Sequence, residues 1–338
     1  MWYYEYMTQI KSIVFCARRK LKTALKNTGF EFSNDDFGPY FFDFIHHLIP
    51  LKFKFLKESF VALQNNKIQG LITLEKDEKS KTKLKISKLF LEKNSYDAGK
   101  LLVQYVLSRY CAMGALSYRV VVDENQQDLL SLFITGCGFY ENAFEYMYQI
   151  SSESASKFSQ ISPEGFAFFK TSCAQEVCEL FNRNINSYQR YNFARTPEQF
   201  DSNFAQGISC DTHFAYVLQD ESQNKIYGYF IVSTRNNKDY VLDFVMDKAF
   251  EVYFDDALAF IISSLNKRNK NWNLFIKIKS YFINYERFKN NLEEHDFTLV
   301  KTSKILTKDF LAKQKEMNIL NSAKIVFNDI TPAFKNSN

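Results

Sequence analysis

The sequence predicts an α/β (α+β) protein made of two copies of one plan, each a mixed, mostly antiparallel twisted sheet flanked by helices. The first observation is an internal repeat, because residues 66–70 (NKIQG) return as residues 224–228 (NKIYG), 158 positions later. The second is that the offset holds elsewhere, since residues 137–139 (CGF) fall on residues 295–297 (HDF). The third is that strand-like and helix-like hydrophobic periods follow each other in the same order in both halves. Two structural units of one type therefore succeed each other along the chain.

Length and composition agree with this division. At 338 residues the chain is too long for one compact core and fits two domains of about 150 residues each. With 46% hydrophobic and 24% charged residues it has an ordinary globular composition. A serine-rich stretch at 151–156, followed by residues 162–165 (SPEG), predicts a linker. The predicted units are a first domain at 1–150, a second domain at 164–310 and a C-terminal tail at 311–338.

In the first half, the hydrophobic pattern predicts three strands, then a helix, a strand, a helix and a last strand. The first two strands, at 60–63 and 68–74, flank an Asn-rich turn typical of a hairpin. From Gly99 the apolar residues recur at helical spacing, and Gly114 is suited to close that helix in a left-handed cap. The remaining elements are a third strand at 84–91, a strand at 119–122, a helix at 129–134 and a strand at 139–148.

The second half gives the same order. A helical stretch also precedes the sheet in each half, at 10–26 and at 174–182. The predicted elements of the second sheet are strands at 214–218, 226–232 and 240–246, a helix at 255–265, a strand at 273–279, a helix at 285–292 and a strand at 298–306.

Composition narrows the classes of function. A net charge of +5 is far below that of a dedicated nucleic-acid binder, so a nucleic-acid partner is not expected. The six cysteines include no Cys-x-x-Cys pair, and with the four histidines they give no zinc-site spacing, so no metal is expected. The start of the chain lacks the pattern of a secretory signal, and no run reaches the roughly 18 apolar residues of a membrane helix. We expect a cytoplasmic protein with reduced thiols and no membrane partner, of an oligomeric state that the sequence does not indicate.

The element order, the hairpin near the NKIxG turn, the long helix after the central strand and the CGF before the last strand resemble the GNAT acyltransferase superfamily, in a tandem form. The resemblance covers 60–148 and, by internal alignment, 211–308. It implies that the strand at 84–91 ends in a turn whose backbone amides hold the diphosphate of an acyl-CoA, acetyl-CoA being the expected co-substrate. The physical basis is that unpaired amides and the dipole at a helix N-terminus attract anions.

Residues 93–100 (KNSYDAGK) stand where the superfamily has its glycine-rich turn. Ala98 and Gly99 allow close backbone approach, and Lys93 and Lys100 supply positive charge. Tyr96 occupies the place of the first glycine of the family's motif, and the turn is about two residues short. Asp97 would compete with a phosphate unless it points outward; alternatively it caps the helix, which stabilises a helix by about 1 kcal/mol.

The duplicate provides an internal comparison, because the equivalent turn reads 253–258 (YFDDAL). Ala257 and Leu258 replace Gly99 and Lys100, and two adjacent carboxylates at this helix start would repel a diphosphate. We therefore expect the cofactor site in the first half only, with the second half forming a wall of the substrate groove or an interface.

The implied reaction is attack of an amine on the thioester, which requires an oxyanion site, a base and a proton for the thiolate. By resemblance, backbone amides near Phe90 and Leu91 stabilise the oxyanion, where the central strand diverges from its neighbour. Asp123, at the end of the strand at 119–122, is the candidate base, although it could instead cap the following helix. Asn125 is a candidate pantetheine contact by resemblance, or a turn residue.

The tyrosine that commonly protonates the thiolate is absent from residues 132–135 (LFIT), so Tyr96 is the candidate acid and Tyr140 the alternative. The leading hypothesis is an acyl-CoA-dependent N-acyltransferase acting on a small-molecule or protein amine. One alternative is a non-catalytic descendant that binds acyl-CoA or a protein partner. The other is a tandem transferase that takes its acyl group from aminoacyl-tRNA, for which stronger basic patches would be expected.

Overall fold

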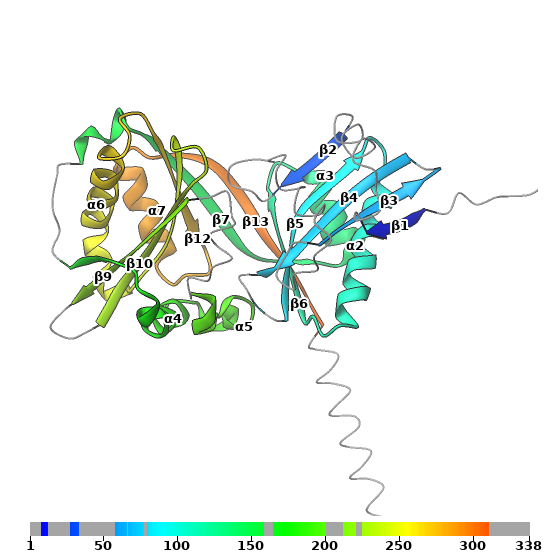
Figure 1. The fold of residues 1–338 in the computed structure, drawn as a ribbon, viewed down its shortest axis with the longest axis horizontal. Helices are drawn as coiled ribbons and strands as arrows, with labels where there is room; N and C mark the ends of the chain where they lie inside the picture. Colours follow the sequence, from blue (N-terminus) through cyan, green and yellow to red (C-terminus); the bar gives the residue numbers. More distant parts are fainter. Residues whose placement is uncertain are drawn as a thin grey trace, which may run out of the picture.

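The computed structural model describes residues 8–12, 28–33, 58–65, 67–77, 80, 82–158, 165–200, 212–220 and 225–310. One 13-stranded sheet runs through both halves of the chain, with helices packed on its faces (Figure 1). Its strand order is β1-β3-β4-β5-β6-β13-β7-β12-β11-β10-β9-β8, and β2 pairs with β5 beside this path. The predicted α/β class with mixed, mostly antiparallel sheets is confirmed.

The first half has the predicted order of elements. Strands β3, β4 and β5 form an antiparallel unit, and β6 returns parallel to β5 after helix α2. The bounds are β3 (Glu58–Gln64), β4 (Lys67–Lys76), β5 (Lys83–Glu92), α2 (Tyr96–Cys111), β6 (Ser117–Asp123), α3 (Gln127–Ser131), its continuation as the π-helical turn η4 (Leu132–Gly136), and β7 (Tyr140–Ser151).

Three features of the first half differ most from the expectation. Helix α2 begins at Tyr96, three residues before Gly99, because the turn Glu92–Ser95 closes early through a bond from the Ser95 amide to the Glu92 carbonyl. β1 (Gln9–Ser12) is a strand, where a helix from residue 10 was expected, since it pairs antiparallel with β3. β2 (Thr28–Ser33) was not predicted at all. The rest of the expected helix, from residue 13, lies outside the described residues.

The second half repeats the first in register. The starts of β4 and β10, of α2 and α6, of α3 and α7, and of β7 and β13 are each 158 residues apart. The helix expected at 174–182 is α4. The bounds are β8 (Phe166–Phe168), α4 (Ala174–Arg183), α5 (Arg190–Phe193), β9 (Thr212–Asp220), β10 (Lys225–Thr234), β11 (Asp239–Met246), α6 (Phe254–Asn266), β12 (Asn273–Lys279), α7 (Tyr285–Glu294) and β13 (Thr298–Asp309), with 3-10 turns η5 (Ser154–Lys157), η6 (Thr171–Cys173), η7 (Ser187–Gln189), η8 (Pro197–Gln199) and η10 (Lys248–Tyr253).

The last strands of the two halves are exchanged. β13, from the end of the second half, lies between β6 and β7, while β7 pairs with β12. In Figure 1 these two long strands join the lobes. Each predicted domain therefore receives a strand from the other, so the ranges 1–150 and 164–310 are repeat units whose sheets interlock. The expected tail at 311–338 and part of the linker lie outside the described residues.

Three of the four hydrophobic clusters among the described residues follow from this arrangement. One lies under α2 and includes Leu102, Val106 and Leu306 of β13; one lies under α6 and α7. The third is on the opposite face and combines residues of both halves, among them Ala143 of β7 and Ile305 of β13. Each Å² of apolar surface buried in this shared core stabilises the junction by about 25 cal/mol.

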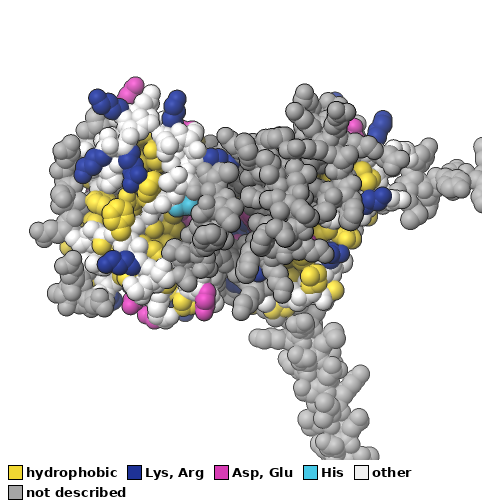
Figure 2. All heavy atoms as spheres, viewed as in Figure 1, with side chains coloured by type: hydrophobic (Ala, Val, Ile, Leu, Met, Phe, Trp, Pro, Cys, Tyr) yellow, Lys and Arg dark blue, Asp and Glu magenta, His cyan; other side chains and the backbone are white. Residues whose placement is uncertain are grey.

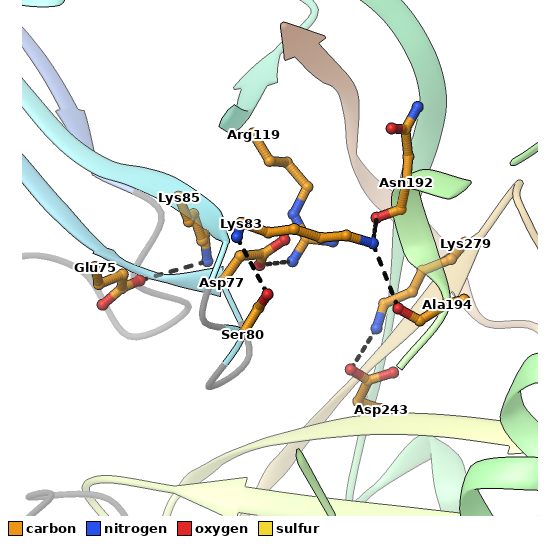
Figure 3. A network of polar contacts seen from close by, with 10 residues as sticks. All are labelled: Glu75, Asp77, Ser80, Lys83, Lys85, Arg119, Asn192, Ala194, Asp243 and Lys279. Carbon is orange, nitrogen blue, oxygen red and sulfur yellow. Dashed lines mark hydrogen bonds and ion pairs between the residues drawn. The ribbon is translucent and has the colours of Figure 1, made fainter. Parts of the chain in front are cut away.

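Polar contacts reinforce the junction (Figure 3). The Lys83 ammonium, on β5, donates to the carbonyls of Tyr191, Asn192 and Ala194 at 2.7, 3.0 and 3.5 Å. Nearby, Arg119 pairs with Asp77. Within the described part of the chain, no helix is long and apolar enough to cross a membrane.

Candidate functional site

The candidate site is a wedge between two parallel strands of the first half. β5 pairs with β6 only where residues Lys83 to Lys85 face Ser117 to Arg119, and the strands diverge beyond that point. Since both run in the same direction, the wedge opens toward their carboxyl ends, at Glu92 and Asp123. An irregularity in the β4–β5 pairing, between Thr73 and Leu74, lies at the same level of β5 and bends it away.

Helix α2 begins at the open end of the wedge. Asn94 adopts the left-handed conformation, with φ of 67°, which Asn tolerates better than most residues. The Ser95 side chain does not cap the helix, because its hydroxyl donates to Gln69 Oε1 at 2.7 Å. The first amides of a helix have no acceptor within it. This end of α2 can therefore offer backbone N–H groups to an anion.

A cavity of about 280 Å³ adjoins this helix start. Its lining includes one cation, Lys93, which adds to the attraction of the helix dipole for an anion. The carboxylates of Glu92 and Asp128 also line it, and their negative charges oppose that attraction. Its walls are Leu91, Glu92, Lys93, Asn94, Ser95, Tyr96, Asp128 and Leu132.

The predicted turn residues have different places. Lys93 is exposed and Tyr96 is 40% exposed, and both line the cavity. The Tyr96 hydroxyl lies 3.0 Å from the point where a Cβ on Gly136 would stand, so the ring reaches across to η4. Asp97 is exposed and, contrary to one expectation, is not the N-cap, which is Ser95.

Ala98 and Gly99 lie behind the cavity wall. Both are buried, and the Gly99 amide is already bonded to the Ser95 carbonyl at 3.1 Å. A Cβ at Gly99 would stand 2.7 Å from Leu91 Cδ1 and 3.3 Å from Leu132 Cδ2. The expectation that the helix begins at Gly99 is therefore wrong, and this glycine instead lets α2 pack closely on β5.

Lys100 is half-buried on α2 and acts electrostatically on Cys137, the residue after η4. Its charge and that of Lys308 act on the Cys137 thiol, but burial outweighs them and raises the pKa of that thiol to about 11. Lys100 is not among the residues that line the cavity. A phosphate contact for it remains a prediction.

Phe90 and Leu91 lie on opposite faces of β5. Leu91 lines the cavity under α2, whereas Phe90 packs with Val61 and Leu71 on the other face. We expected this stretch to have no strand neighbour inside the wedge. Instead, β2 pairs with residues Lys88 to Glu92, with Glu31 opposite Phe90 and Phe30 opposite Leu91. The exposed edge inferred from the sequence is thus taken by the chain itself.

Asp123 and Asn125 are bonded to each other at the end of β6. Asp123 Oδ1 accepts from the Asn125 backbone amide at 2.9 Å and from its side chain at 3.1 Å. The N-cap of α3 is Gln126, so Asp123 orders the turn before the helix without being its cap. Its carboxylate keeps a second oxygen, 4.0 Å from the Lys301 ammonium.

A polar row that the sequence did not reveal extends from Asp123 across the centre of the sheet. In register, Asp123 lies beside Ser303, Ser303 beside Glu145, and Glu145 beside Lys279. Lys279 in turn bonds Asp243 at 2.5 Å (Figure 3). The row joins strands from both halves, and no local sequence signal could place these residues together.

The alternative acid, Tyr140, is at the wrong end of the strands. It pairs with Thr307, which faces Arg119, four residues and about 13 Å along β6 from Asp123. Its hydroxyl donates to Asp309 at 2.5 Å and accepts from Asn192. Burial is the main cause that raises the pKa of Tyr140. Phe133, in the stretch where the family's tyrosine was sought, is fully buried.

The corresponding wedge of the second half is filled. β11 and β12 pair from Asp239 to Leu242 and then diverge. Beyond that point the Lys279–Asp243 ion pair and the buried Asn284, which donates to the Met246 carbonyl at 3.4 Å, occupy the opening. Asp255, in the first turn of α6, accepts from Asn291 at 2.7 Å. Among the described residues, no group of His, Cys, Asp and Glu is arranged to hold a metal.

Comparisons with known proteins identify the architecture. No protein-family model matches the chain, and no curated protein sequence matches it. A solved tandem GNAT protein from the clavulanic acid biosynthesis pathway is similar, with a TM-score of 0.62 and 11% identity over 90% of this chain and 98% of that one. A GCN5-related N-acetyltransferase from Sphaerobacter thermophilus matches with a TM-score of 0.55 and 10% identity, covering 89% of this chain and 95% of that one. The chain has the fold of the GNAT N-acetyltransferases in its tandem form.

Proposed function

We propose that the protein is an acyl-CoA-dependent N-acyltransferase whose cofactor site is the wedge of the first half. The observation that carries this proposal is the divergence of β5 from β6 directly beside a cavity at the start of α2. This combination offers helix amides for the diphosphate and, once β2 no longer pairs with β5, a channel for the extended thioester arm. In the second half, the Lys279–Asp243 ion pair and Asn284 stand at the corresponding position, which favours the first half as the cofactor site.

The proposed reaction assigns roles to Asp123, Tyr96 and Lys93. The amine attacks the thioester carbonyl, a C–N bond forms, the C–S bond breaks, and the thiolate leaves with a proton. Asp123 is the base and accepts the amine proton, directly or through a water. Tyr96, on the cavity wall, is the acid and donates a proton to the thiolate. Lys93 and the first amides of α2 hold the diphosphate. Acetyl-CoA is the co-substrate proposed.

A second candidate function is a non-catalytic acyl-CoA or partner binder. It is favoured by the buried Phe133 in place of a tyrosine and by Glu92 and Asp128 in the cavity wall. A tRNA-dependent transferase has less support. On the face shown in Figure 2, uncharged and hydrophobic side chains separate the described Lys and Arg side chains into small groups, and the net charge of the chain is +5. A small-molecule or protein amine is therefore the acceptor proposed.

Binding of acetyl-CoA tests the location of the site. Lys93→Glu reverses the only cation among the cavity residues, so we expect at least a tenfold rise in the dissociation constant measured by titration calorimetry. Lys267→Glu, at an exposed position in the second half, makes the same charge change away from the cavity and should leave binding unchanged. Equal effects of both variants, or no binding to the unmodified protein, would contradict the proposed site. Thiol release with a panel of amines then separates an enzyme from a binder.

A further inference from the structure

One strand of the first half, β2, has no counterpart among the described residues of the second half. β2 lies along β5 with Thr28 opposite Glu92 and Ser33 opposite Lys88, which is the stretch of β5 that β6 leaves. Each side of a strand can pair with one extended neighbour only, because its N–H and C=O groups on that side point to a single partner. While β2 is in place, the wedge edge of β5 between Lys88 and Glu92 cannot pair with another extended group.

The duplicate shows that this strand is not a requirement of the fold. Shifted by 158 residues, β2 corresponds to residues 186–191, which are Asn186, the turn η7 (Ser187–Gln189) and the first two residues of α5 (Arg190–Phe193). That segment is helical, and it lies beside the loop after β12, where the Asn186 amide donates to the Tyr281 carbonyl. The second wedge is closed by side chains instead of a strand.

We propose that β2 is an autoinhibitory strand that occupies the acyl-CoA position on β5 and must leave it before the coenzyme binds. This inference rests on the proposed function. The pantetheine arm of acyl-CoA is extended and carries two amides, so it needs the same donors and acceptors that β2 now pairs with. The two are alternative partners of one strand edge.

Several features make β2 displaceable. It is six residues long, and among the described strands its one partner is β5. Its register is irregular between Thr28 and Phe30, so the ladder is not continuous. A short strand at an edge contributes few bonds and opens at a lower free energy than a central strand. β4 pairs with β5 from Leu84 to Leu91 on its other side and can hold it when β2 leaves.

Proline substitution of two adjacent residues tests the proposal. Neighbouring residues of a strand direct their N–H groups to opposite sides, so Glu31→Pro with Phe32→Pro removes at least one bond to β5 whichever way the strand faces. The matched control, Glu31→Ala with Phe32→Ala, removes the same side chains but keeps both N–H groups. If β2 is docked in about nine molecules in ten, the proline variant should bind acetyl-CoA about tenfold more tightly than the alanine variant by calorimetry.

Hydrogen–deuterium exchange of the unmodified full chain gives an independent reading. Acetyl-CoA should raise exchange at the amides of Thr28 to Ser33 while residues 88–92 stay protected. If coenzyme binds to both variants equally and β2 keeps its protection, the inference is overturned and the proposed function stands. If neither variant binds acetyl-CoA although exchange at β2 rises in the proline variant, the coenzyme does not bind at this site. That result would contradict both the proposed function and the autoinhibitory role of β2.

Discussion

Gly99 illustrates how a single residue sets the distance between a helix and a strand. A Cβ there would stand 2.7 Å from Leu91 and 3.3 Å from Leu132, both of which line the cavity. Gly99→Val should therefore cost about 1–3 kcal/mol of unfolding free energy through overpacking and should push Leu91 into the cavity. Denaturant unfolding and acetyl-CoA titration should register a loss of stability and of affinity together.

The control for this prediction is Gly114→Ala at the other end of the first half's long helix. Gly114 has φ of 94°, and a Cβ there meets nothing within 4 Å, so strain of about 1–2 kcal/mol arises without a packing conflict. Its acetyl-CoA affinity should not change. Full stability of the Gly99→Val variant would show that α2 and β5 are less tightly packed than described.

Asp123 is the residue on which turnover is expected to depend. Asp123→Asn keeps the size of the side chain and an oxygen that can accept from Asn125, but it cannot accept a proton. We expect turnover of the best amine to fall by about 10²–10⁴ with little change in acetyl-CoA affinity. Unimpaired turnover of this variant would show that Asp123 is not the base. A fall in Tm of many degrees would indicate a structural role instead.

At the scale of elements, β13 is the strand on which both halves depend. Ile305 pairs with Val121 on one side and with Ala143 on the other, and its side chain is buried in the core that both halves share. Ile305→Pro removes a ladder bond from a central strand and should cost at least about 3 kcal/mol, with loss of the folded protein or a large fall in Tm.

Thr298→Pro provides the comparison within the same strand. Thr298 is the first residue of β13, is exposed and pairs on one side only, with Gln149. A proline is tolerated at the first residue of a strand, so calorimetry should record a small change in Tm. Similar effects at both positions would argue against the central place of β13.

At the scale of the whole molecule, the interlocked sheet predicts that both halves unfold together. One transition is expected in differential scanning calorimetry, with equal calorimetric and van't Hoff enthalpies. Hydrogen exchange should give similar free energies for the amides of β4 and β10, which occupy equivalent places in the two halves. Two separate transitions would mean that each half keeps its fold without the strand from the other.

Substitution of Lys83 tests how much the polar junction contributes to the unfolding free energy. Lys83→Met removes three bonds to carbonyls of the second half, and bonds from a charged donor are each worth about 1.5–3 kcal/mol. Lys85, two residues along the same strand, pairs with Glu75 at 3.9 Å, so Lys85→Met should cost no more than about 1 kcal/mol. If both variants lose the same unfolding free energy in urea, Lys83 does not stabilise the junction.

The sequence by itself determined the repeat, the order of elements and the fold class, because hydrophobic periodicity and turn residues are local properties. It also indicated the turn at 93–100 as the coenzyme site, which stays a prediction; of the residues in this turn that it named, Lys93 and Tyr96 line the cavity. Tertiary structure alone decided the exchange of β7 and β13, the row from Asp123 to Lys279 and the pairing of β2 with β5. These depend on pairings between residues as far apart as Ser117 and Asp309, 192 positions along the chain. Several strands could pair with the same strand edge, and no local sequence pattern determines which of them does.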